Sequence, residues 1–162
     1  SKVAINTFKN LANAKPVQSA LTKIKGLKEP ATKLVNVVKE STFWLSSTPE
    51  EESLADKCKY PRICSYAVLE IKNTNHRFVF ANTHLDHLCA EGRENQVRFL
   101  IKNLEDLLDI PFILSGDFNS ESNDNSYLFV RNYLEDSKYL FDKVDFNASE
   151  NGYQLTLMLK MN

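Results

Sequence analysis

Apolar positions recur at helical spacing through the first forty residues and then change to strand-like runs. The first part divides into three stretches, the second running from Pro16 to Gly26 and the third starting at Pro30. A proline at the first helical position costs no hydrogen bond, and a glycine can close a helix in the left-handed conformation. The pattern predicts an N-terminal helical extension over residues 1–40. Its apolar stripes can pack on the rest of the chain or dock on another subunit or on RNA.

Strand-like patterns dominate from residue 41 onward. Four apolar, β-prone runs predict strands, at residues 41–45, 63–71, 78–83 and 111–115. The polar stretch 72–76 lies between the second and third runs, which together predict a β-hairpin. The last dozen residues are apolar enough for a terminal strand.

Helices are expected between and after these strands. Apolar residues at helical spacing predict a helix over about 91–108, on the positions Val97, Leu100, Ile101, Leu104 and Leu108. A polar loop at 120–125 precedes a second, short helix beginning near Tyr127. The acidic residues 50–52 follow Pro49 and suit an exposed loop. Residues 41–162 therefore read as one α/β (α+β) domain.

Two of the predicted strands stop abruptly in residues that can bind a metal ion or a phosphate. The run 78–83 continues into His84, and the run 111–115 continues into Gly116-Asp117-Phe118-Asn119. Catalytic groups commonly occupy such positions, because the sheet fixes the backbone while the following loop leaves the side chain exposed. The ends of these two strands are therefore the candidate site.

Phosphoester hydrolysis needs a group to activate water, donors to the phosphoryl oxygens and a positive charge against the developing negative charge. Asp117 can bind a cation such as Mg²⁺ or orient the attacking water. Asn119, two residues on, is expected on the same side of an extended backbone, where its amide can donate to phosphate. His84 can act as a proton donor or as a positively charged donor. Arg62 offers a bidentate phosphate clamp, although it can also pair with a nearby acid.

Asp86 and His87 follow His84 closely, as candidate rim residues or as structural hydrogen-bonding groups. The order His84-x-Asp86-His87 also fits the end of the zinc motif HxHxDH of metallo-β-lactamase-like hydrolases. Asn82 stands where that motif needs its first histidine, and the later ligands are absent from the sequence. A zinc centre of that kind is disfavoured.

The segments Asn82-Thr83-His84-Leu85 and Ser115-Gly116-Asp117-Phe118-Asn119 together resemble the endonuclease/exonuclease/phosphatase (DNase I-like) superfamily. The similarity covers roughly residues 41–140 and includes Phe43-Trp44-Leu45-Ser46 and Pro61-Arg62-Ile63-Cys64. It implies a partial four-layered α/β sandwich with an active site at one end of the packed sheets.

The same resemblance implies roles for the candidate residues. His84 would be a catalytic histidine, Asp117 and Asn119 the water-orienting and phosphate-binding pair, and Arg62 a phosphate-contacting arginine. Asp117 would be the metal ligand in this chain, for Mg²⁺ or Mn²⁺. The substrate would be a phosphoester of undetermined class, with nucleic acid among the candidates.

The family pattern is incomplete in this sequence. The family needs an early Asn and a metal-binding Glu before the Phe-Trp-Leu-Ser segment, and a late Asp-His pair, whereas this chain has no histidine after His87. One hypothesis is a phosphoester hydrolase whose missing groups come from a partner chain or from a further part of the same gene. The other is an inactive family remnant that serves as a structural subunit. Both predict another protein chain covering the incomplete sheets.

Charge and cysteine content refine this prediction. Residues 1–40 hold eight lysines against two acids, a net of +6, while the other 122 residues hold 12 basic and 19 acidic side chains, a net of −7. The imbalance suggests two pieces joined near residue 40 and argues against a dedicated nucleic-acid surface in 41–162. Three cysteines without a CxxC motif favour free thiols and a reducing intracellular compartment. No apolar run is long enough to span a bilayer.

Overall fold

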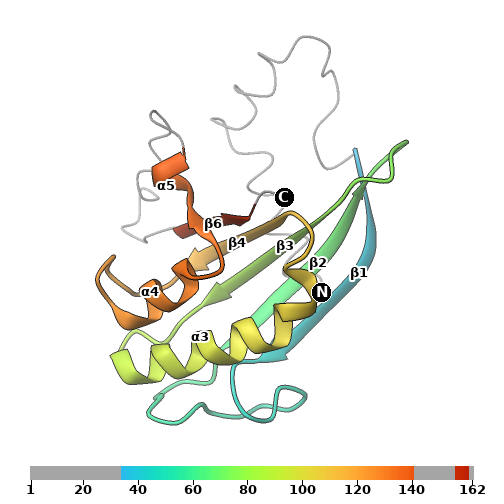
Figure 1. The fold of residues 1–162 in the computed structure, drawn as a ribbon. Coiled ribbons are helices and arrows are strands. Elements are labelled where there is room, and N and C mark those ends of the chain that lie inside the picture. Colours follow the sequence, from blue (N-terminus) through green and yellow to red (C-terminus); the bar gives the residue numbers. More distant parts are fainter. Residues whose placement is uncertain (1–33, 141–155, 161–162) are drawn as a thin grey trace, which may run out of the picture.

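The computed structural model describes residues 34–140 and 156–160, and their strands form one mixed sheet (Figure 1). In chain order the elements are β1 (Val35–Trp44), β2 (Ile63–Ile71), β3 (Arg77–His84), α3 (Ala90–Leu104), η2 (Glu105–Leu107), β4 (Phe112–Asp117), α4 (Asn125–Arg131), β5 (Glu135–Asp136), α5 (Ser137–Leu140) and β6 (Thr156–Lys160). The strand order is β1-β2-β3-β4-β6-β5. Only β3 and β4 run parallel, and all other neighbours are antiparallel.

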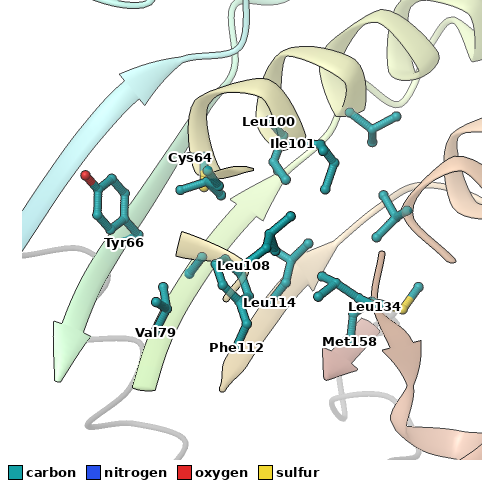
Figure 2. Close-up of a cluster of buried hydrophobic side chains, with 14 of the residues drawn as sticks. Cys64, Tyr66, Val79, Leu100, Ile101, Leu108, Phe112, Leu114, Leu134 and Met158 are labelled. Atoms are coloured by element: carbon teal, nitrogen blue, oxygen red, sulfur yellow. The ribbon is translucent and has the colours of Figure 1, made fainter. Parts of the chain in front are cut away.

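The helices α3 and α4 cover one face of this sheet (Figure 1). The main hydrophobic core lies between them and the strands, and Leu100 and Ile101 of α3 point into it together with side chains of β2, β3 and β4 (Figure 2). The buried side chains of α3 recur at helical spacing, at Val97, Leu100, Ile101 and Leu104. Removing this apolar surface from water is the main force that fixes the helix on the sheet.

The opposite face of the sheet carries a smaller apolar cluster and a polar row beside it. Ala67, Leu69 and Phe80 form the cluster. Strand register then aligns four polar residues across β1 to β4: Thr42, Ser65, Asn82 and Ser115. Because side chains alternate between faces along a strand, His84 and Asp117 share this second face.

The parallel pairing of β3 and β4 brings the two candidate strand ends together. His84 is the register partner of Asp117, and Asn82 is the register partner of Ser115. The connection between these parallel strands runs through α3, as a parallel pair requires a long crossover. Both strands therefore stop at the same end of the sheet, with His84 beside Asp117.

Most of the predicted elements are confirmed. The hairpin of β2 and β3, the helix α3 with its continuation η2, the strand β4, the short helix α4 and the terminal strand β6 all lie where the pattern placed them. The α/β class is confirmed, and the described part consists of one sheet layer and one helix layer. All three cysteines are free thiols.

The predicted helix after Pro30 is wrong for residues 35–40. These residues form the first half of β1 and pair with β2 from Val35 onward. The rest of the predicted extension, residues 1–33, lies outside the described residues, so the division at residue 40 stays a prediction. In the part of the chain that the structure describes, no helix has the length and apolar character to cross a bilayer.

Candidate active site

His84 and Asp117 form the centre of the site at the ends of β3 and β4. Nε2 of His84 lies 4.0 Å from Oδ2 of Asp117, and the side chains are 48% and 19% exposed. A pocket of about 370 Å³ opens beside His84. It is lined by Trp44, Pro61, Arg62, Ile63, Ser65, Asn82, Thr83 and His84. Two residues predicted from separate segments, Arg62 and His84, thus line one pocket.

Arg62 directly precedes β2 and lines the pocket together with His84. Its carbonyl oxygen accepts a hydrogen bond from the backbone N–H of Leu45 at 2.8 Å, which fixes the start of the strand. Its Nη2 lies 3.4 Å from Nδ1 of His87, an arrangement that needs an unprotonated Nδ1 as acceptor. Among the described residues no carboxylate lies within ion-pair distance of Arg62, so the alternative of a local ion pair is not found.

The environment of His84 favours a neutral imidazole. Burial, followed by the positive charge of Arg62, lowers the pKa of His84 below its ordinary value of 6.5. The carboxylate of Asp117 acts in the opposite direction and does not outweigh them. His84 is therefore mainly uncharged near neutral pH, and the net positive charge beside the pocket comes from Arg62.

The chain turns sharply after Asp117, which corrects the expectation for Asn119. Asn119 has φ of +47°, so the two side chains do not follow one extended strand. Instead, the backbone N–H of Asn119 donates to Oδ1 of Asp117 at 2.9 Å, and its Nδ2 donates to the carbonyl of Leu85 at 3.0 Å. Asn119 thereby joins the ends of β3 and β4, and its role toward phosphate stays a prediction.

Asp86 and His87 have different surroundings. Asp86 is fully buried, and its carboxylate accepts hydrogen bonds from three backbone N–H groups, which makes it a structural residue. His87 is exposed and its ring stacks on Tyr60, with centroids 5.5 Å apart. His87 is thus exposed beside Arg62 while Asp86 is buried, and a rim role for either residue stays a prediction.

The described residues do not form a metal site on their own. No group of three or more His, Cys, Asp or Glu side chains in the described ranges could hold an ion. Asp117 can supply one carboxylate, and one of its oxygens already accepts the Asn119 N–H. Mg²⁺ requires near-octahedral oxygen coordination, so further ligands would have to come from substrate, water or residues outside the described ranges.

Two pocket residues, Asn82 and Trp44, were not predicted as site residues from the sequence. Asn82 lies on the same face of β3 as His84, and its Nδ2 donates to Ser115 at 3.2 Å (O) and 3.1 Å (Oγ). Trp44, the last residue of β1, also lines the pocket. Side chains alternate between the two faces of a strand, so residues two apart share a face. This rule could have placed Asn82 beside His84 from the sequence.

The chain resembles known proteins in its structure. The sequence matches no protein-family model and no curated protein. Among solved structures, a functionally unknown conserved protein from Enterococcus faecalis is 26% identical with a TM-score of 0.68 over 79% of this chain and 56% of that chain. An endonuclease/exonuclease/phosphatase family protein from Bacteroides thetaiotaomicron is 28% identical with a TM-score of 0.64, over 77% and 51%.

A third similar structure carries an activity in its name. The mannosyl-6-phosphatase of Bacteroides thetaiotaomicron is 27% identical with a TM-score of 0.65, over 79% of this chain and 54% of that chain. This chain thus spans about half the length of each of these three proteins. The shared fold confirms the resemblance found in the sequence, and the chain has the partial fold of an endonuclease/exonuclease/phosphatase domain.

Proposed function

We propose that this chain carries the phosphate-binding half of a phosphoester hydrolase site. The observation that carries the proposal is that Arg62 and His84 line one pocket of about 370 Å³, while Asp117 lies 4.0 Å from His84 at the same end of the sheet. An arginine, an imidazole and a carboxylate are the groups that such a reaction uses to bind phosphate, transfer a proton and orient water. The similarity to a mannosyl-6-phosphatase supports the same class of reaction.

Each side chain has a role that suits its surroundings. The guanidinium of Arg62 binds two phosphate oxygens, because it has no described carboxylate partner to compete. His84 is neutral before substrate binds and accepts or donates a proton at Nε2, the atom nearest Asp117. Asp117 orients the attacking water through its free oxygen.

The remaining groups of the site are proposed to come from elsewhere. The chain spans about half of the similar structures. A partner chain or a further part of the same protein is the proposed source of the missing metal ligands, and a partner chain is the proposed cover for the sheet. Dependence on Mg²⁺ or Mn²⁺ belongs to this proposal. The substrate is a phosphate ester, and the choice between a sugar phosphate, a phospholipid headgroup and nucleic acid is left to the assay.

The test is hydrolysis by the purified chain of bis(p-nitrophenyl) phosphate, p-nitrophenyl phosphate and a fluorescent oligonucleotide. Each substrate is assayed with Mg²⁺, with Mn²⁺ and with EDTA. Asp117→Ala is compared with Asp106→Ala, which removes an exposed aspartate of η2 instead. We expect metal-dependent turnover that Asp117→Ala abolishes and Asp106→Ala leaves intact.

A second candidate is an inactive family remnant that serves as a structural subunit. It is favoured by the lack, within the described residues, of three metal-ligating side chains close together. A folded chain with no turnover above that of Asp117→Ala, in every metal condition, would support this candidate and contradict a self-sufficient enzyme. A copurifying partner is then added to the same assay. Turnover with the partner present indicates that this chain carries half of an active site, and no turnover indicates a structural subunit.

A further inference from the structure

Asp86 joins the two loops that border the pocket. Its Oδ2 accepts hydrogen bonds from the backbone N–H groups of Lys59 at 2.6 Å and Tyr60 at 3.0 Å. Its Oδ1 accepts a hydrogen bond from the backbone N–H of Leu88 at 2.7 Å. One buried carboxylate therefore connects the segment that leads into β2 with the segment that leaves β3.

Each of these two segments carries a ring that contacts Arg62. The ring centroid of Tyr60 lies 5.9 Å from Cζ of Arg62, and Nδ1 of His87 lies 3.4 Å from its Nη2. The two rings stack on each other with an angle of 12° between their planes. Tyr60 is bound directly by Asp86, and His87 lies between Asp86 and its other partner, Leu88. The carboxylate thus fixes the backbone of both rings.

Asp86 is itself held in place from α3. Oε1 of Gln96 accepts a hydrogen bond from the backbone N–H of Asp86 at 2.8 Å. Arg93 donates to the carbonyl oxygen of Asp86 at 3.3 Å and to Oδ2 of Asp124 at 3.2 Å. Both side chains are buried. Asp86 cannot shift without disturbing this network, so it is a fixed point from which the rings are placed.

We propose that Asp86 is a positioning residue that aims Arg62 into the pocket. Its carboxylate holds Tyr60 and His87, and their stacked rings hold the guanidinium on the side that faces His84. Asp86 is fully buried and acts through Arg62 without touching substrate. The inference rests on the proposed function, since it assigns a partner to the phosphate-binding arginine.

The test is a double-mutant cycle with inorganic phosphate as the ligand, measured by isothermal titration calorimetry on the full chain. The variants are Arg62→Ala, Asp86→Asn and the two together. We expect each single change to weaken phosphate binding by about tenfold or more, and the double variant to bind no more weakly than Arg62→Ala. A structural role unrelated to Arg62 would give additive losses, and this result would overturn the proposal.

A second pair of variants keeps the proposal testable if Asp86→Asn does not fold. Tyr60→Leu and His87→Ala alter exposed side chains, and both should weaken phosphate binding in the wild-type background and have no effect beside Arg62→Ala. Tyr127→Phe is the control, because it removes a buried hydrogen bond to Asp136 on a strand at the opposite edge of the sheet. A loss of affinity in the control equal to that in Asp86→Asn would contradict the proposal.

The double-mutant cycle also distinguishes a failure of this inference from a failure of the proposed function. No phosphate binding by the wild type, or none that depends on Arg62, overturns the phosphate site and the positioning role together. Weakened binding in Arg62→Ala, with unchanged binding in Asp86→Asn, Tyr60→Leu and His87→Ala, overturns the positioning role alone.

Discussion

Asp86 shows how a buried charge can be stabilised mainly by backbone hydrogen bonds, with a smaller contribution from the positive charge of Arg62. Burial alone would raise its pKa, but the hydrogen bonds from Leu88, Lys59 and Tyr60 outweigh this effect and hold the pKa below its ordinary 3.8. These bonds stabilise the ionised form, since a carboxylate is a better acceptor than a protonated acid. The fold therefore gains stability from Asp86 only while it is ionised.

The first prediction concerns the acid stability of the chain. Asp86→Asn should lower the free energy of unfolding by about 2–4 kcal/mol near pH 7, because backbone donors lose a charged acceptor. Since the folded pKa is depressed, this contribution is present above the unfolded pKa and is lost as the pH falls through the folded pKa. Urea unfolding of both proteins should give a difference that shrinks below pH 3.8. A difference that is constant with pH would contradict the assignment.

The second prediction concerns Cys58, which packs against the start of α3. A Cβ at Gly92 would lie 2.8 Å from its Sγ. Burial, followed by the charge of Asp86, raises the pKa of the Cys58 thiol to about 11. Because the thiolate is the reactive form, iodoacetamide should modify Cys58 about 100-fold more slowly than a free cysteine near pH 8. Mass spectrometry of Cys89→Ser protein measures this rate, and labelling at the speed of a model peptide would be inconsistent with the raised pKa of this partly buried thiol.

From the sequence we could predict the positions of those candidate site residues that depend on a strand alone. His84 and Asp117 each follow an apolar run that predicts a strand. The end of that run was enough to place both residues at the ends of strands. Asn119 depends on a turn with positive φ, and Asp86 depends on hydrogen bonds from residues 26 and 27 positions earlier in the chain. Neither a single backbone turn nor a long-range contact produces a periodic pattern of apolar residues in the sequence.

At the scale of elements, β1 explains the one clear error in the predicted secondary structure. Its register with β2 shifts between Val37 and Lys39, and this irregularity breaks the two-residue alternation. Val37 and Val38 are consecutive and both exposed, at 47% and 44%. A strand with a bulge loses its period-2 pattern, and the apolar positions 31, 34, 35 and 38 then fit helical spacing by coincidence.

The third prediction concerns the contact between β3 and β4 at Gly116. This glycine has φ of +148°, and a Cβ on it would lie 1.8 Å from the carbonyl oxygen of its register partner Thr83. Gly116→Ala must therefore push the strands apart next to His84 and Asp117. We expect a loss of more than about 3 kcal/mol in the free energy of unfolding, measured with urea.

Ser115→Ala is the matched control for Gly116→Ala, because it changes the preceding residue of β4 without altering the backbone. It removes the hydrogen bonds of one hydroxyl, which should cost about 1 kcal/mol. Equal losses for the two variants would show that the close approach of the strands is not what requires the glycine.

At the scale of the whole molecule, the sheet ends in strands that lack a second neighbour within the described residues. The sheet order places β1 and β5 at the edges, and β1 is ten residues long. An edge strand of this length with exposed valines presents backbone donors and acceptors to another chain. This is the physical basis for expecting a partner.

The fourth prediction is that the purified chain self-associates or copurifies with a partner through the β1 edge. Sedimentation velocity should show species heavier than the 18.5 kDa chain. Val37→Lys with Val38→Lys should shift the population toward the monomer, because charged residues on an edge strand oppose pairing. Leu128→Lys, at a residue of α4 that is 49% exposed, is the control and should leave the distribution unchanged. A monodisperse monomer with a cooperative thermal melt would contradict the prediction of a stable partner.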